Sequence, residues 1–261
     1  MATDANRARP PSASAPVDIG TRLELFVDEL LVERLEGVAL RLHSPQPQPL
    51  ARSPVRGAYL SVLRDGDVYR AYYRQYAASY AGAGYDGNPG ETTRYAHSTD
   101  GREWAFPDLG LHEVDGSTRN NAILAGCAPF SHNFAPCVPV DSRPGAQPRF
   151  RALAGVHPGG GHAGANADGL HAFGSDDGLH WEPLAGGPVI THEDFAFDSQ
   201  NVSFWSPVEQ CYVCYFRTWT TPHGRLRAVS RTTSDDYLDW SAPVPLDANL
   251  PGEHLYVSGT H

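Results

Sequence analysis

The feature that most constrains the fold is one seven-residue motif that occurs three times in the chain. Ser98-Thr-Asp-Gly-Arg-Glu-Trp104 recurs as Ser175-Asp-Asp-Gly-Leu-His-Trp181 and, with Tyr in place of Gly, as Ser234-Asp-Asp-Tyr-Leu-Asp-Trp240. A Ser, and an Asp two residues later, can hydrogen-bond backbone amides in a tight turn, and Gly adopts a conformation that other residues resist. The Trp can pack back over the hairpin. The motif therefore predicts the tip of a β-hairpin, and we interpret its residues as structural.

The segments upstream of each motif repeat as well. An aromatic segment of alternating pattern, typical of a strand, precedes each motif: Val68–Arg74, Arg149–Gly155 and Cys211–Arg217. A turn and another apolar segment precede each of those: Ala58–Leu63, Asn133–Val138 and Asn201–Trp205. Each unit therefore reads as an inner strand, a second strand, a third strand, the Asp turn and a Trp strand, which is a four-stranded antiparallel meander.

A meander that is repeated radially gives a β-propeller, an all-β fold. A β-sandwich would not need the same hairpin signature in each unit. We expect a disordered tail over 1–20 and a partial propeller over 21–261, with blades at about 55–110, 120–185 and 197–246 and the first strand of a fourth at about 252–261. Propellers close with four to eight blades. We therefore expect a truncated propeller, a fragment or a chain completed by another one.

Charge and composition limit the classes of partner that the chain is expected to bind. The net charge is −10, and no run of Lys and Arg offers the basic patch that nucleic acid or an anionic membrane needs. No stretch approaches the roughly 18 apolar residues of a membrane span. The first twenty residues lack the apolar core of a secretory signal, so the chain as given is expected to be cytoplasmic. The sequence does not indicate an oligomeric state.

Cysteine and histidine spacing favours no metal site. Cys211 and Cys214 form a C-x-x-C, but positions three apart on a strand point to opposite faces. We interpret these cysteines as small buried hydrophobic residues. The twelve histidines include no H-E-x-x-H and no zinc-finger spacing. The sequence thus predicts neither a metal nor another cofactor.

Candidate site residues lie where the inner strands begin, because these strand ends converge at one mouth of a propeller channel, where ligand pockets form. The candidate substrate-binding residues are His132, Asn133, Gln200, Asn201 and His254. The candidate catalytic residues are the carboxylates Asp28, Asp198 and Glu253. Hydrolysis of a glycosidic bond needs two carboxyl groups. Asp198 or Glu253 would serve as the general acid, and Asp28 as the base or nucleophile.

Four segments, in the same order along the chain, resemble those of a known family. They are Leu25–Val32, Tyr95–Trp104, Phe197–Val202 and Glu253–Tyr256. From about Leu23 to its end, the chain is similar to the five-bladed β-propeller glycoside hydrolases, the group of invertases, levansucrases, fructan hydrolases and arabinanases. The resemblance implies a five-bladed propeller, cut here to about three blades, and a funnel-shaped site with three inner-strand carboxylates. It implies a carbohydrate substrate, a plant or microbial oligo- or polysaccharide.

Two functional hypotheses follow. The first is a glycosidase or transglycosidase, which requires Asp198 and Glu253 to lie within about 10 Å of each other. The alternative is a non-catalytic propeller that binds carbohydrate or acts as a scaffold. A three-bladed pocket would lack part of its wall, so we expect the 261-residue chain by itself to show little or no activity.

Overall fold

The computed structural model describes residues 18–20, 31–41, 43–44, 46, 54–138, 148–156, 169–193, 196–221, 224–246 and 252–254. The chain divides into two units, residues 1–49 and 50–261. The described residues of the first unit form turns and bends. All the described strands belong to the second unit. No helix among the described residues is long and apolar enough to cross a membrane.

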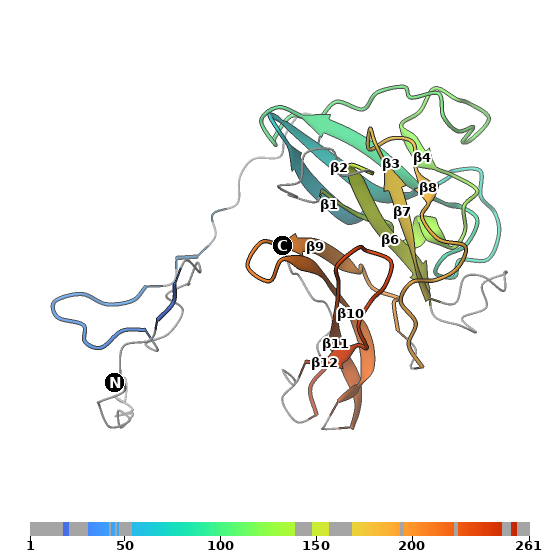
Figure 1. Cartoon of the computed structure of the whole chain (residues 1–261). Coiled ribbons are helices and arrows are strands. Elements are labelled where there is room, and N and C mark those ends of the chain that lie inside the picture. Colours follow the sequence, from blue (N-terminus) through green and yellow to red (C-terminus); the bar gives the residue numbers. More distant parts are fainter. Residues whose placement is uncertain are drawn as a thin grey trace. The chain divides into compact units, whose positions relative to one another are not determined.

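The described residues of the second unit form three four-stranded sheets, each from one continuous part of the chain (Figure 1). The first is β1 (Ala58–Asp65), β2 (Val68–Tyr76), β3 (Glu91–Ser98) and β4 (Ala122–Leu124). The second is β5 (Ala135–Cys137), β6 (Phe150–Val156), β7 (Gly169–Ser175) and β8 (Glu182–Pro183). The third is β9 (Val202–Ser206), β10 (Cys211–Thr221), β11 (Gly224–Ser234) and β12 (Val244–Pro245). One 3-10 helix, η1 (Phe130–His132), leads into β5.

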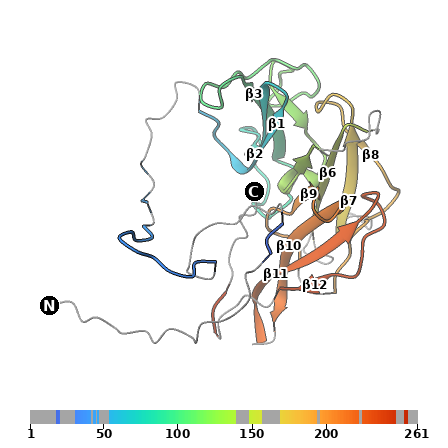
Figure 2. The same cartoon turned by 60° about the vertical axis from the view of Figure 1, so that its left-hand side comes forward.

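Strand order within each sheet follows the chain, and every paired strand is antiparallel. The first strand of each sheet contacts that of the next, β1 with β5 and β5 with β9. Figure 2 shows the three sheets in chain order, one beside the next. The predicted all-β fold of repeated meanders is therefore confirmed. Residues 252–254, at the expected start of a fourth blade, form no strand, and residues 255–261 lie outside the described part.

The first sheet departs from the repeat in its outer strand. In the second sheet the outer strand, β8, follows the motif Trp directly, and in the third, β12 begins a few residues after it. In the first, Ala105 forms only an isolated bridge with His97, and β4 follows a long loop. The Trp strand predicted after Trp104 is thus reduced to one bridge.

The three motifs form the predicted hairpin tips. Asp177 Oδ1 accepts hydrogen bonds from the amides of Leu179 and His180, at 2.8 and 2.9 Å, and Ser175 Oγ accepts one from Gly178 at 2.8 Å. The other two turns repeat these bonds. Burial alone would raise the pKa of Asp177, but these amides and the His180 side chain lower it well below its ordinary value. The motif is therefore held by its own Asp.

Tyr237 shows what replaces glycine in the third motif. Its φ is +75°, close to +77° at Gly178, in a region that costs a residue with a Cβ roughly 1–2 kcal/mol. The Tyr237 side chain is fully buried, its hydroxyl lies 2.7 Å from Ser203 Oγ, and its ring packs on Tyr212 at 5.0 Å. Burial of the ring and this hydrogen bond offset the backbone strain.

Neighbouring sheets are joined by a repeated contact between arginine and an aromatic ring. Arg70 of β2 lies over the Phe150 ring at 5.1 Å, and Arg151, at the equivalent place in β6, lies over Tyr212 at 5.0 Å. Apolar cores fill the space beside both contacts. Cys214 is fully buried in one of these cores, whereas Cys211 is half-buried, and both are free thiols. Cys214 therefore matches the interpretation as a small buried hydrophobic residue, whereas Cys211 departs from it.

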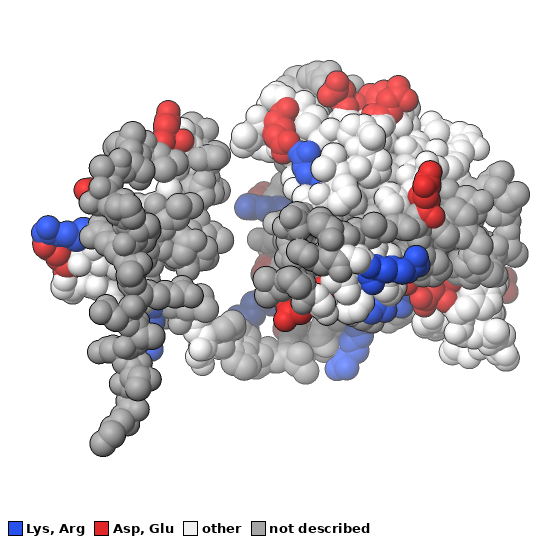
Figure 3. Space-filling model, turned by 90° about the horizontal axis from the view of Figure 1, so that it is seen from below, with Lys and Arg blue, Asp and Glu red and all other residues white. Residues whose placement is uncertain are grey.

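Charge on the surface is mixed. On the face shown in Figure 3, acidic and basic side chains of the described residues are scattered among uncharged ones.

Candidate functional site

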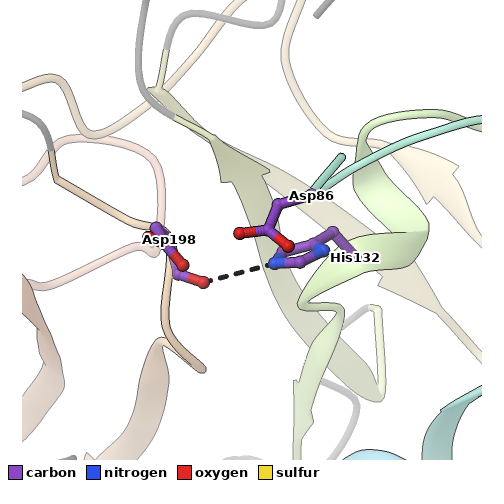
Figure 4. A group of neighbouring side chains, drawn as sticks. All are labelled: Asp86, His132 and Asp198. Carbon is purple, nitrogen blue, oxygen red and sulfur yellow. Dashed lines mark hydrogen bonds between the residues drawn. The ribbon is translucent and has the colours of Figure 1, made fainter. Parts of the chain in front are cut away.

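Three side chains from different parts of the second unit meet near the inner strands (Figure 4). His132 ends η1, Asp198 precedes β9, and Asp86 lies in the loop between β2 and β3. One ligand atom of each lies within 4.8 Å of the others. His132 is buried, Asp198 is partly exposed and Asp86 is exposed. The group therefore opens toward solvent above a buried imidazole, and we call it the mouth cluster.

Glu91, the first residue of β3, anchors two parts of this cluster. Its carboxylate lies 3.0 Å from His132 Nδ1, and both side chains are fully buried. It also accepts a hydrogen bond from the amide of Gly87 at 3.0 Å, which fixes the loop next to Asp86. Arg74 and Tyr76 donate to its other oxygen, at 3.2 and 3.0 Å. These donors satisfy a carboxylate that would be costly to bury alone.

The His132 ring is therefore oriented. Its Nδ1 is surrounded by Glu91, by the Gly87 amide at 3.1 Å and by Arg74 Nη1 at 2.5 Å. Its Nε2 lies 3.3 Å from the backbone carbonyl of Asp198, the contact dashed in Figure 4. The Tyr59 ring meets the imidazole edge-on at 5.2 Å. Only Nε2 is turned toward the mouth.

Asp198 is positioned by a strained turn. Phe197, directly before it, is fully buried with a φ of +67°, an unusual conformation for a bulky residue. The Asn133 amide donates to the Phe197 carbonyl at 2.6 Å, and the Asn201 amide donates to it at 3.2 Å. The Asp198 carboxylate pairs with Arg217 at 2.5 Å. The main chain and the side chain of Asp198 are thus both fixed.

Tyr59 and Gln200 tie β1 to this turn. Tyr59, with a φ of +49°, donates its hydroxyl to the Asp198 carbonyl at 3.1 Å, and burial raises the pKa of this phenol. The Gln200 amide donates to Ser61 Oγ at 2.8 Å. Two non-glycine residues with positive φ thus flank the mouth. Such strain is often retained at functional sites.

The inner strands also line a groove of about 320 Å³. Its lining is mostly apolar and comes from β1, from β5 with its flanking residue, and from β9 with Gln200. Leu60, Val62 and Phe204, three of its residues, are 38 to 46% exposed. The groove thus adjoins the mouth cluster through Gln200, which carries hydrogen bonds to both Ser61 and Leu60.

The structure brings together five of the residues predicted from the sequence: His132, Asn133, Asp198, Gln200 and Asn201. Asn133 and Asn201 are fully buried, and their amides bind main-chain carbonyls. Glu253 and His254 are exposed, and His254 Nδ1 accepts a hydrogen bond from the Arg227 amide on β11 at 2.9 Å. Asp28 lies outside the described residues.

Sequence reasoning missed Asp86, Glu91 and the two arginines. Asp86 and Glu91 flank a Gly- and Pro-containing loop directly before a strand, a placement that could have indicated polar groups at a strand end. Arg74 and Arg217 occupy the same place in the second strands of the first and third units, where the second unit has Gly155. That repeated position was a usable signal, because the arginine there pairs with a carboxylate of the site in both units, Glu91 in the first and Asp198 in the third.

Fold and site together define an all-β protein of propeller type, with a polar cluster where its inner strands begin. No protein-family model matches the chain, and no curated protein does. Parts of the chain are similar to several solved structures.

Three of these structures illustrate the similarity. A glycosyl hydrolase from Bacteroides ovatus has 15% identity and a TM-score of 0.41, over 70% of this chain and 50% of that one. An N-acetylgalactosamine deacetylase from F. plautii, in complex with blood group B trisaccharide, has 18% identity and a TM-score of 0.46, over 74% and 55%. A protein of the GH130 family of mannoside phosphorylases, which contains glycoside hydrolases that target β-1,2 mannosidic linkages in Candida mannan, has 14% identity and a TM-score of 0.34, over 73% and 70%. The chain spans about half the length of the first two.

Proposed function

We propose that the chain is a glycoside hydrolase-like protein that acts on an oligo- or polysaccharide at the mouth cluster. The observation that supports this is the meeting of Asp86 and Asp198, carboxylates from the first and third units, beside the buried His132. Hydrolysis of a glycosidic bond uses a pair of carboxyl groups.

The spacing of the two carboxylates is suited to this chemistry. In retaining glycosidases the two carboxyl groups lie roughly 5–5.5 Å apart. The ligand oxygens of Asp86 and Asp198 lie within 4.8 Å of each other. Asp198 stays a candidate catalytic carboxylate, as in the hypothesis from the sequence, and Asp86 is proposed as the second one. Glu253 and Asp28 stay proposed as further carboxylates.

Several side chains around the cluster suit a sugar. Tyr76 is half exposed and hydrogen-bonded to Glu91, so its ring can stack on a sugar face while its hydroxyl stays fixed. His132 and Gln200 are proposed to contact substrate hydroxyls, and His254 to contact a more distant sugar unit. Asn133 and Asn201, also proposed from the sequence as substrate contacts, act in this view by holding the turn at Phe197.

One observation favours the alternative, a non-catalytic carbohydrate-binding propeller. Arg217 pairs with the Asp198 carboxylate, and Arg74 pairs with Glu91. Carboxylates that are paired with arginine can accept hydrogen bonds from sugar hydroxyls without taking part in bond cleavage. Binding and cleavage must therefore be measured separately.

The test begins with binding, because we expect the 261-residue chain to turn over weakly. Calorimetry against a panel of neutral oligosaccharides should find a ligand whose affinity falls at least tenfold in Asp86→Asn. Asp67→Asn, an exposed position in the turn between β1 and β2, is the matched control. Release of reducing ends from that ligand should be lost in Asp86→Asn and Asp198→Asn. If no glycan binds, or if Asp86→Asn binds like Asp67→Asn, the mouth cluster is not the sugar site. Binding without cleavage by the wild type would favour the alternative.

A further inference from the structure

The mouth cluster has the composition of a metal site. Asp86, His132 and Asp198 offer two carboxylate oxygens and one imidazole nitrogen within 4.8 Å of one another. Two ligands of one zinc-like ion, each at about 2.0–2.2 Å, can be as much as about 4.4 Å apart. Small side-chain rotations of the exposed Asp86 are therefore enough to close the three groups around one ion.

The partner behind His132 is a second, independent indication. Glu91 is fully buried and lies 3.0 Å from Nδ1, so Nε2 is turned toward the two aspartates. A histidine that binds a metal through one nitrogen commonly donates the other N–H to a carboxylate, which fixes the ring and raises its basicity. With a cation on Nε2, His132 would carry its proton on Nδ1 and donate it to Glu91. The Gly87 amide and Arg74 Nη1, which lie 3.1 and 2.5 Å from Nδ1, would then donate to Glu91 alone, as both already do. The same Glu91 holds the loop of Asp86 through the Gly87 amide.

The charges around the cluster favour a cation. The cluster and its nearest partners include three carboxylates, of Asp86, Glu91 and Asp198, and two guanidinium groups. Arg74 pairs with Glu91, and Arg217 pairs with Asp198. Arg217 bonds Oδ2 of Asp198, which leaves Oδ1 available. The Asp86 side chain makes no hydrogen bond to another described residue. A ligand that binds its carboxylate would therefore break no such hydrogen bond.

We propose that Asp86, His132 and Asp198 bind one divalent cation, with Glu91 as the positioning residue behind His132. One nitrogen and two carboxylate oxygens suit Zn²⁺ or Mn²⁺ better than Ca²⁺ or Mg²⁺, which prefer oxygen ligands alone. Three protein ligands leave coordination positions open for water or a sugar hydroxyl. The cation would supply Lewis-acid chemistry at the mouth. This inference deepens the proposed function and rests on it for the sugar that would reach the open positions. A cation held by Asp86 and Asp198 would replace direct acid, base or nucleophile roles of these two carboxylates.

The test is calorimetry on the untagged full chain after chelator treatment, with ZnCl₂ and separately MnCl₂ as titrants. The wild type should bind about one ion per chain. Asp86→Asn, a substitution at an exposed position, should weaken binding at least tenfold, and Glu91→Gln should weaken it 10–100-fold. Asp67→Asn should bind like the wild type. Circular dichroism of each variant shows whether it is folded.

The outcomes separate the two proposals. No saturable binding of either ion by the wild type, or Asp86→Asn binding as tightly as the wild type, overturns the metal site. Glycan binding is then measured on the same chelator-treated protein. If glycan binds there without any ion site, the proposed function stands alone. If the ion binds with the expected variant pattern but no glycan does, the metal site stands and the proposed function fails.

Discussion

Glu91 lies 3.0 Å from His132, with both side chains fully buried, although Glu91 begins β3 of the first sheet and His132 ends η1, which leads into the second. Glu91 also holds the loop of Asp86 through Gly87. One buried carboxylate therefore positions two of the three members of the mouth cluster. Around it, Arg74 and Tyr76 complete a network in which the loss of one member affects the others.

Glu91→Gln should destabilise the chain by about 1–3 kcal/mol, because Arg74 and His132 lose a charged partner in a buried place. Urea denaturation measures this. Asp67→Asn, exposed in a turn, should stay within about 0.5 kcal/mol of the wild type. An equal free energy of unfolding for both variants would show that the Glu91 network contributes nothing to the stability of the fold.

Acid should weaken the fold through the hairpin tips. Hydrogen bonds lower the pKa of Asp177 and Asp236 below the ordinary 3.8, against the opposing effect of burial. A carboxyl group with a lowered folded-state pKa adds stability above its unfolded value, and this is lost as the pH falls through the folded value. We therefore expect the urea concentration at the unfolding midpoint to decrease as the pH drops below about 4. This decrease should be smaller for Asp177→Asn. Identical pH profiles for Asp177→Asn and the wild type would contradict this role of the turn.

Tyr237 should be worth more to stability than the glycine it replaces in the motif. Tyr237→Gly relieves a positive φ but removes a fully buried ring and its contact with Ser203, so we expect a net loss of about 2–4 kcal/mol. Tyr237→Phe keeps the ring and should lose about 0.5–1.5 kcal/mol. A thermal denaturation series ranks the three chains. Tyr237→Gly matching the wild type would mean that relief of strain equals the packing of the ring.

The repeated motif was enough to predict the fold, because each meander is a local structure. Its turn residues, such as Asp177 and Gly178, bond within a few positions of themselves. The strands that each turn joins are also consecutive in the sequence, so the order of strands in a sheet could be predicted from their order along the chain. The number of blades is a property of ring closure, which three sheets do not determine.

The mouth cluster was only partly predictable, because it joins residues far apart in the sequence. His132 and Asp198 stood at the start of inner strands, where the repeat directs attention. Asp86 sits in the loop between β2 and β3, outside the repeated motif, and its approach to His132 depends on Glu91. No local spacing encodes that meeting, so the sequence predicted no metal where the structure places three ligand atoms together.

The most direct test of the mouth cluster is a crystal structure of the full chain soaked with ZnCl₂, with anomalous diffraction recorded at the zinc edge. We expect one peak about 2.0–2.2 Å from His132 Nε2 and from oxygens of Asp86 and Asp198. The same peak should be absent from crystals of Asp86→Asn. A peak elsewhere, or none at the mouth while His132 Nε2 keeps its contact with the carbonyl of Asp198, would contradict the assignment of this cluster as a metal site.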